Sequence, residues 1–370
     1  MAEPTSIPLR RRILFLAAPY AALAAALFTI EIGVRVTRPH IDPLEWLVAA
    51  PQQQAQLQDQ RDVRIYEGDP LLFWRLRPGL DGVIWDLTRV STNAQGLRYP
   101  RPVEAKRPGA FRIVCVGDSV TFGYRVPRVL PRRPDDYDPT WRPYPALVEA
   151  ALRSANPGRT IEVIPLAVPG YSSHQGRAWL ARDIARLGPD VVTACFGWND
   201  IGRRAVSDRV AMSTSPTAAA ARRVFMSSQA LVHLGVWLRG RPEGAARGGA
   251  PGTMRVPREE YVANLLALAT QARTRGAKPV LIGPVYRDRV SHPPEGDDIA
   301  AHRTALREAA SREQIAYLEI PELTENAAPG NAALFEEHIH PNHKGHKLMA
   351  ERLLAFLADR HLLGDLKAAP

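Results

Sequence analysis

From residue 111 onward, the chain alternates short apolar runs with longer amphipathic segments. The short runs, predicted to be strands, are FRIVCVG (111–117), IEVIPLAV (161–168), DVVTACFG (190–197), PVLIGPV (279–285) and IAYLEI (315–320). The longer segments, predicted to be helices, are 144–155, 176–188, 258–276, 298–314 and 346–362. Strands that are regularly separated by helices form a parallel sheet covered on both faces. The alternation therefore predicts an α/β domain, a three-layer α/β/α sandwich around a mostly parallel five-stranded sheet.

Glycines and polar residues follow three of the predicted strands. They are Gly117, Asp118 and Ser119 after the first strand, Gly170 after the second, and Gly197, Asn199 and Asp200 after the third. In an open parallel sheet the functional site lies beyond the carboxyl ends of the strands. We therefore expect these residues to meet at one edge of the sheet.

Ser119 is a candidate nucleophile at that edge. A serine hydroxyl attacks efficiently only when a base removes its proton and a third group orients the base. The C-terminal stretch FEEHIHPNHKGHK places Glu337 three residues before His340, with Pro341 directly behind it. A carboxylate at this spacing reaches the imidazole within one turn of chain. The stretch thus supplies a candidate base and a candidate orienting acid.

A tetrahedral intermediate also needs hydrogen-bond donors that are in place before the reaction. Ser119 opens a predicted helix, so its N–H points outward at a helix N-terminus. Gly170 presents a backbone N–H with no Cβ in the way, and Asn199 offers a side-chain NH₂ group. These three groups are the predicted oxyanion hole, and Asp118 and Asp200 are expected to hold the loops at the strand ends.

This set of residues resembles the SGNH (GDSL) hydrolase family. The first block is Gly117-Asp118-Ser119, followed by Val120 where the family motif has leucine. Gly170, Gly197-x-Asn199-Asp200 and Glu337-x-x-His340-Pro341 follow in the family order, over about residues 111–360. The resemblance implies a flavodoxin-like fold, Ser119 as nucleophile, His340 as base, and an oxyanion hole made by the Ser119 and Gly170 N–H groups and Asn199 Nδ2. The family usually has aspartate where this chain has Glu337.

An N-terminal apolar segment predicts a membrane anchor. After Arg10–Arg12, residues 13–30 carry no charge; as a helix they extend about 27 Å, enough to cross a bilayer core. The prediction is a cytoplasmic N-terminus (1–12), a transmembrane signal-anchor helix (13–34) and a catalytic domain outside the cytoplasmic membrane, periplasmic or at the cell surface. A signal peptide cleaved near Ala22-Leu23-Ala24 is the alternative.

The remaining boundaries come from changes in composition. Residues 35–65, which include PQQQAQLQDQRD, are expected to be a stalk, and 66–110 a small β-rich arm with short aromatic segments broken by Gly, Pro and Asn. The hydrolase domain is predicted at 111–362, with insertions at 124–142 and 201–256 and a tail at 363–370. Both insertions leave from the carboxyl edge of the sheet. They are expected to roof the site, to be surface decoration, or to contact the membrane or a partner.

Composition limits the other function classes. The net charge is +10, but the basic residues are scattered without interleaved aromatics, which disfavours nucleic-acid binding. An anionic membrane surface or an acidic glycan fits this charge better. The two cysteines, Cys115 and Cys195, form neither a disulfide framework nor a zinc site. His338, His340, His343 and His346 have no H-E-x-x-H spacing, so no metal or other cofactor is expected.

The sequence therefore predicts a membrane-anchored serine esterase with a Ser119–His340–Glu337 triad. The expected substrate is an ester-bearing small molecule, lipid or envelope glycan. Two alternatives remain open: an O-acyltransferase that uses the same residues to modify an envelope polysaccharide, and a non-catalytic anchored binding module of the same fold.

Overall fold

A computed structural model describes residues 9–41, 65–130, 132–133, 135–204, 207–212, 216–239, 252–287, 295–324 and 331–368. These residues form two units: 9–41 with 216–239, and the rest of the described chain. Most of the predicted stalk lies outside the described residues. The predicted insertion at 201–256 is divided, because its middle part belongs to the unit that contains the N-terminal helix.

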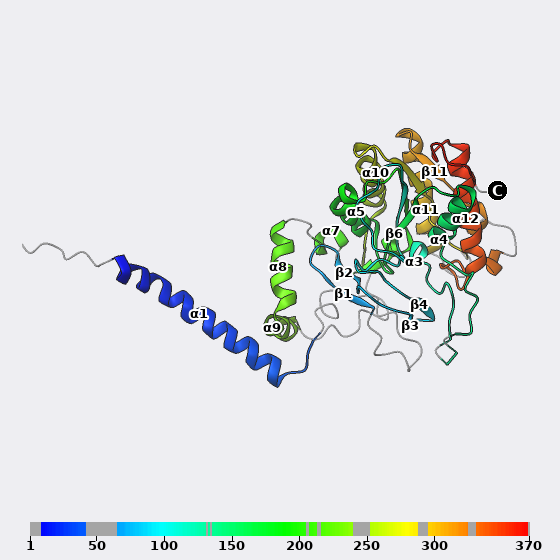
Figure 1. Ribbon diagram of the computed structural model, residues 1–370. Helices are drawn as coiled ribbons and strands as arrows, with labels where there is room; N and C mark the ends of the chain where they lie inside the picture. Colours follow the sequence, from blue (N-terminus) through cyan, green and yellow to red (C-terminus); the bar gives the residue numbers. More distant parts are fainter. Residues whose placement is uncertain are drawn as a thin grey trace, which may run out of the picture. The chain divides into compact units, whose positions relative to one another are not determined.

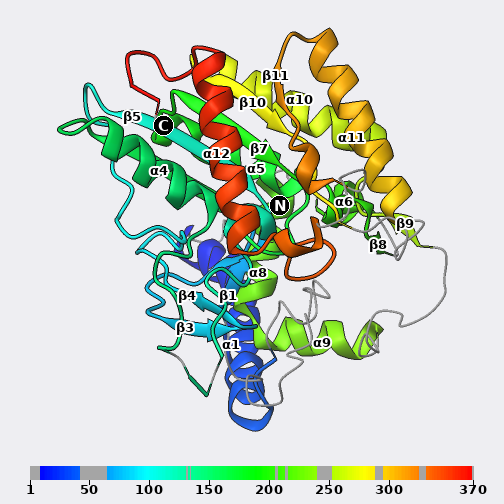
Figure 2. The ribbon, with the colours of Figure 1, turned by 90° about the vertical axis from the view of Figure 1, so that its right-hand side faces the viewer.

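The larger unit is built on a five-stranded parallel sheet (Figures 1 and 2). Its strands are β5 (Phe111–Gly117), β6 (Ile161–Ala167), β7 (Val191–Cys195), β10 (Lys278–Ile282) and β11 (Ala316–Leu318). The spatial order is β11-β10-β7-β5-β6, and every pairing is parallel. In chain order this is 2-1-3-4-5, the order of flavodoxin-like folds. The predicted fold class is confirmed.

Helices cover both faces of the sheet, as expected from its continuous apolar strands. The long helices of this unit are α4 (Tyr144–Ala155), α5 (Ser173–Leu187), α10 (Arg258–Thr274), α11 (Glu295–Arg312) and α12 (His343–Asp359). Figure 2 shows α4 and α12 side by side on the near face. Helices α5, α10 and α11 pack with one another and with the strands.

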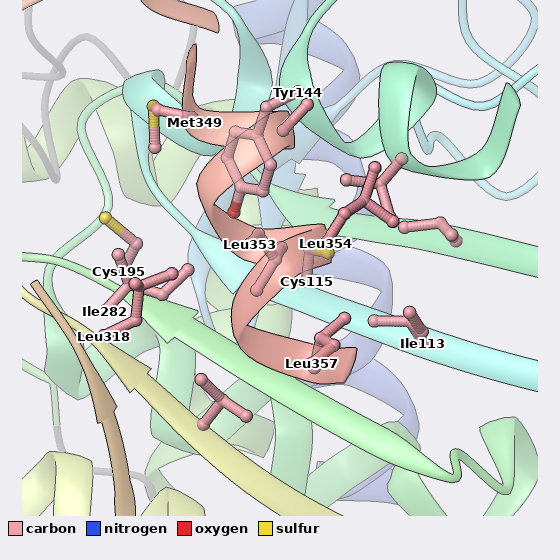
Figure 3. Close-up of a cluster of buried hydrophobic side chains, with 14 of the residues drawn as sticks. Ile113, Cys115, Tyr144, Cys195, Ile282, Leu318, Met349, Leu353, Leu354 and Leu357 are labelled. Carbon is pink, nitrogen blue, oxygen red and sulfur yellow. The ribbon is translucent and has the colours of Figure 1, made fainter. Parts of the chain in front are cut away.

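The core beneath α4 and α12 is apolar and fully buried (Figure 3). Tyr144, Leu353 and Leu357 of the two helices pack over Ile113 and Cys115 of β5. Cys115 and Cys195 are both free and buried. The core therefore fixes the strands from which the loops of the site emerge.

The predicted β-rich arm consists of two antiparallel hairpins. One pairs β1 (Tyr66–Asp69) with β2 (Phe73–Leu76), and the other pairs β3 (Val83–Trp85) with β4 (Thr88–Val90). The second hairpin turns through Asp86 and Leu87, both at positive φ. The short strands of the arm thus lie within residues 66–90, and its residues 91–110 contain no strand.

Short elements at the carboxyl edge shape the site. They are α3 (Ser119–Phe122), α6 (Trp198–Ile201), β8 (Arg203–Arg204), α7 (Asp208–Ala211), β9 (Thr253–Met254), η2 (Pro321–Leu323) and η3 (Asn331–Leu334). β8 pairs antiparallel with β9. The chain between these two strands contributes α7 to the larger unit and α8 and α9 to the smaller one.

The smaller unit contains α1 (Leu9–Thr37), α8 (Pro216–Ser227) and α9 (Gln229–Arg239). Helix α1 is longer than the predicted span at 13–34. Its part from Ala17 to Thr37 is long and apolar enough to cross a membrane, and none of it is buried within the protein. This matches the N-terminal apolar helix that the sequence predicts.

Candidate active site

Ser119 is the first residue of α3, directly after β5. The preceding Asp118 caps this helix, since its Oδ1 accepts a hydrogen bond from the Val120 N–H at 2.9 Å. The turn is tight: a Cβ on Gly117 would lie 2.0 Å from Thr121 Oγ1. Strand, glycine and cap together place the serine hydroxyl at the carboxyl edge of the sheet.

Ser119, His340 and Glu337 form one chain of hydrogen bonds. His340 Nε2 lies 2.8 Å from Ser119 Oγ, and His340 Nδ1 is hydrogen-bonded to Glu337 Oε1. The imidazole is almost fully buried, with 3% of its surface exposed. The structure therefore brings the expected nucleophile, base and acid together in space.

Glu337 is held as a carboxylate. Its Oε2 accepts a hydrogen bond from the Ile339 N–H at 3.1 Å and lies 3.2 Å from His338 Nδ1. Burial raises the pKa of Glu337, but the hydrogen bond and charge of His340 and the bond from Ile339 outweigh it, so the pKa falls to about 2. The acid is thus ionised at neutral pH and acts on the histidine as an anion.

The structure brings Asn199 and Gly170 to the same edge. Asn199 follows Trp198 in the first turn of α6, and its Nδ2 donates to the Tyr171 carbonyl at 3.0 Å and, over 3.4 Å, to Asp118 Oδ2. Gly170 is at φ +85°, a conformation that favours glycine. The two predicted oxyanion donors therefore lie on adjoining turns, linked by Tyr171.

Asp118 and Asp200 are structural parts of this edge. Asp200 Oδ1 accepts hydrogen bonds from the Ser173 backbone N–H at 3.0 Å and from its hydroxyl at 2.5 Å. Burial raises the pKa of Asp118 to about 6, although the hydrogen bond from Val120 lowers it. Burial likewise raises the pKa of Asp200 to about 7, although the hydrogen bonds from Ser173 lower it. The two carboxyls join the loops to α3 and α5. Gly197 lets the third loop pass close to Pro284, because a Cβ at this position would lie 2.6 Å from the Pro284 side chain.

Residues without a sequence signal also support the site. The buried guanidinium of Arg255 donates to the Gly170 carbonyl at 2.9 Å and to Asp208 Oδ2 at 2.8 Å. Arg98 donates to the carbonyls of Phe122 and Gly123, at 2.6 and 2.8 Å, directly after the serine turn. Both arginines hold backbone carbonyls of the loops that carry the candidate site, a role that depends on distant parts of the chain.

The arm reaches the histidine through Tyr124. The Tyr124 ring packs against the imidazole of His340, with ring centroids 4.2 Å apart. The Tyr124 hydroxyl donates to Asp86 in the turn of the β3–β4 hairpin, and Arg125 donates to the same carboxylate at 3.2 Å. The first part of the predicted insertion at 124–142 thus flanks the site. Its Arg128 also pairs with Glu336 at 3.2 Å.

The pocket beside Ser119 is small, with a cavity volume of about 10 Å³. Its lining residues are Asp118, Ser119, Val120, Cys195, Phe196, Gly197, Trp198, Pro284, Val285, Ile339 and His340. A cavity of this size holds about one water molecule. The lining residues therefore leave little enclosed space beside the serine.

The histidines near the C-terminus have separate surroundings. His346 Nδ1 accepts a hydrogen bond from the Tyr144 N–H at 3.1 Å, His343 stacks on Trp141 with centroids 3.8 Å apart, and His338 contacts Trp198 edge-on. Within the described residues, no group of three or more His, Cys, Asp or Glu side chains is arranged to hold a metal.

Comparison with known proteins gives one family match. Residues 115–348, more than half of the chain, match the model of the GDSL-like lipase/acylhydrolase family. A search of curated proteins found no match.

Solved structures with a similar fold include two hydrolases. Axe2, an acetylxylan esterase from Geobacillus stearothermophilus, is 18% identical over 69% of this chain and 95% of its own, with a TM-score of 0.44. LAE5, an alpha/beta hydrolase enzyme from the metagenome of Lake Arreo, Spain, is 19% identical over 69% of this chain and 96% of its own, with a TM-score of 0.43.

Proposed function

The chain belongs to the GDSL-like lipase/acylhydrolase family and hydrolyses esters, and we propose that it does so as a serine esterase with Ser119 as its nucleophile. The observation that carries this proposal is the hydrogen-bonded chain from Ser119 Oγ through His340 to the Glu337 carboxylate. Both ring nitrogens of the imidazole are hydrogen-bonded, Nε2 to the serine and Nδ1 to the acid, as nucleophilic catalysis by serine requires.

In the proposed reaction, Ser119 Oγ attacks the acyl carbonyl while His340 Nε2 takes the hydroxyl proton. The carbonyl oxygen becomes an oxyanion that accepts hydrogen bonds from the Ser119 and Gly170 N–H groups and Asn199 Nδ2. His340 then gives the proton to the leaving alcohol, which leaves an acyl-enzyme. A water molecule, deprotonated by His340, attacks the acyl-enzyme and releases the acid, while Glu337 stabilises the imidazolium formed in each step.

The small pocket supports a short acyl group, with acetyl as the best fit. The proposed physiological substrate is an acetyl ester on an envelope glycan, whose sugar part stays outside this pocket. In the proposed topology, α1 crosses the cytoplasmic membrane, and the hydrolase unit lies outside it. The apolar helix and the arginines at 10–12 before it support this topology.

Fluorophosphonate labelling tests the nucleophile. The probe is expected to label the wild type and to leave Ser119→Ala unlabelled, with Ser154→Ala, an exposed serine on α4, as the serine control. Labelling of Ser119→Ala at the wild-type level would refute the proposal.

Assays with p-nitrophenyl acetate and octanoate test the acyl pocket. We expect kcat/KM to favour acetate by at least about tenfold, because the longer chain exceeds the small enclosed space beside Ser119. Equal values for the two esters would contradict the acetyl assignment. Acetyl groups that appear on an added glycan acceptor, in place of free acetate, would identify acyl transfer.

A further inference from the structure

Helix α9 belongs to the same unit as the apolar helix α1, although about 190 residues of chain separate them. The carboxylate of Glu31 connects the two helices, and we call this set of hydrogen bonds the Glu31 joint. Glu31 of α1 accepts hydrogen bonds from the backbone N–H groups of Gln229 and Ala230, at 2.9 and 3.0 Å. It also accepts one from the Ser228 hydroxyl at 2.8 Å. An acid in this position satisfies the free N–H groups at the start of α9 and interacts favourably with the helix dipole.

Further bonds reinforce the joint on both sides of Glu31. The Gln229 side chain accepts from the Ile41 N–H at 3.0 Å and donates to the Ile41 carbonyl at 3.1 Å. Arg35 donates to the Ser227 carbonyl at 2.8 Å and to Glu31 at 2.6 Å. The start of α9 is therefore tied to the last turns of α1 by both side chain and backbone.

The position of Glu31 in α1 determines the depth at which this joint lies relative to a bilayer. Glu31 is the first charged residue after the uncharged run 13–30. Such a run crosses about 27 Å of hydrocarbon as a helix. This step rests on the proposed membrane anchoring, with the uncharged run 13–30 of α1 in the hydrocarbon: Glu31 then lies where the hydrocarbon ends and the headgroup layer begins.

One face of α9 is apolar and exposed. Leu231, Leu234, Trp237 and Leu238 lie on it at helical spacing. Their exposed fractions rise along the helix, from 38% at Leu231 and 48% at Leu234 to 66–77% at the last two positions. Tryptophan is among the residues most favoured at the membrane–water interface. Residues Gln229–Leu238 form a short apolar helix, too short to cross a bilayer. A helix of this kind that starts at headgroup level and presents an exposed apolar face fits the interfacial layer.

We propose that α9 is a second membrane contact, which lies in the interface of the bilayer that α1 spans and inserts Trp237 and Leu238 among the lipids. The positive charge of this unit favours contact with an anionic lipid surface. Within the described residues of this unit, Glu31 is the only acidic residue, and the joint occupies it, whereas Arg38 and Arg223 are exposed. The hydrolase is then held to the membrane at two places in its sequence.

A lipid-quenching experiment on the full chain tests this proposal. Trp237→Cys carries an environment-sensitive NBD probe, and the protein is reconstituted into vesicles of phosphatidylcholine and phosphatidylglycerol with nitroxide lipids. Cys115 and Cys195 are 0% and 2% exposed, so the introduced thiol takes the label. The matched control is Val210→Cys, an exposed apolar position in the other unit. We expect a blue-shifted emission at 237, quenched most by nitroxides near the headgroup, and an unquenched emission at 210.

Two further arms separate the possible failures. A carbonate wash reports on α1 alone: release of the protein would refute the membrane anchor and this inference together. Retention of the protein with a water-like, unquenched probe at 237 would refute only the role of α9, and self-quenching of that probe at higher protein density would assign the face to a second copy. Glu31→Ala is expected to abolish quenching at 237 without release of the protein. Full quenching in this variant would refute the proposal that Glu31 holds α9 at the membrane surface.

Discussion

Glu337 shows how one additional methylene group is accommodated at the proposed position of the orienting acid. The family usually has aspartate at this position, and the longer side chain still reaches His340 Nδ1. The backbone N–H of Ile339 holds the second carboxylate oxygen at 3.1 Å, so both oxygens of the longer acid are engaged. The proposed orienting group is therefore a partly buried glutamate that is ionised at neutral pH.

Substitution of this acid tests its role. Glu337→Gln keeps the shape but removes the charge that stabilises the imidazolium, so kcat for p-nitrophenyl acetate is expected to fall roughly 10³–10⁴-fold. Glu337→Asp keeps the charge and is expected to retain more activity than Glu337→Gln. Circular dichroism of both variants checks the fold. A glutamine variant with near-wild-type kcat would remove Glu337 from the triad.

At the scale of elements, the β3–β4 hairpin and the loop after α3 act on the histidine together. Tyr124 packs against His340 and is fixed by Asp86 in the hairpin turn. Through Tyr124, an arm that comes before the main sheet in sequence is thus connected to the proposed base.

Tyr124 variants test this coupling. Tyr124→Ala removes the ring that packs on the imidazole, and kcat is expected to fall at least about tenfold with a smaller change in KM. Tyr124→Phe keeps the ring and loses only the bond to Asp86, so it is expected to retain most of the activity. Equal loss in both variants would assign the effect to the hydroxyl instead of the packing.

Arg255 is a second positioning residue at this scale. Arg255→Met keeps much of the side-chain volume but removes the hydrogen bond to the Gly170 carbonyl. We expect kcat to fall about 10–100-fold through displacement of the oxyanion turn, with KM little changed. The matched control is Arg112→Met, a buried arginine that pairs with Glu162 on β6. A rise in KM with unchanged kcat would instead assign Arg255 to substrate binding.

Local patterns in the sequence predicted a large part of the fold and of the candidate site. Buried strands are continuous apolar runs, and the residues that end them mark one edge of the sheet, so Ser119 and Asn199 could be assigned to that edge. Arg255, Arg98 and Tyr124 were missed, because their partners lie far away in the chain and no local spacing distinguishes them from surface residues. The division of the 201–256 insertion was missed for the same reason, since the contacts of Glu31 with the start of α9 span 197–199 residues.

At the scale of the whole molecule, buried carboxyls make stability depend on pH. Burial raises the pKa of Asp200 from its ordinary 3.8 to about 7. The folded state therefore binds a proton more tightly than the unfolded state between these values. By linkage, the stability that this group contributes is fully present below pH 3.8 and is lost as the pH rises through about 7.

Unfolding of the detergent-solubilised full chain in urea tests this linkage. Asp200→Asn cannot titrate, so the free energy of unfolding of the wild type is expected to fall, relative to this variant, by at least about 1 kcal/mol between pH 5 and pH 8. Asp183→Asn is the control, because its carboxylate lies on α5 and pairs with the partly exposed Arg182. A difference that does not change with pH would show that Asp200 stays ionised.

The chain passes between the two units three times: after residue 41, between 212 and 216, and again after 239. A protease that cuts only in the glutamine-rich segment after residue 41 leaves the hydrolase unit covalently joined to α8 and α9. The hydrogen bonds of Glu31 then still connect that fragment to α1. In the proposed topology, release of the hydrolase unit from the membrane therefore requires cuts on both sides of α8 and α9 as well.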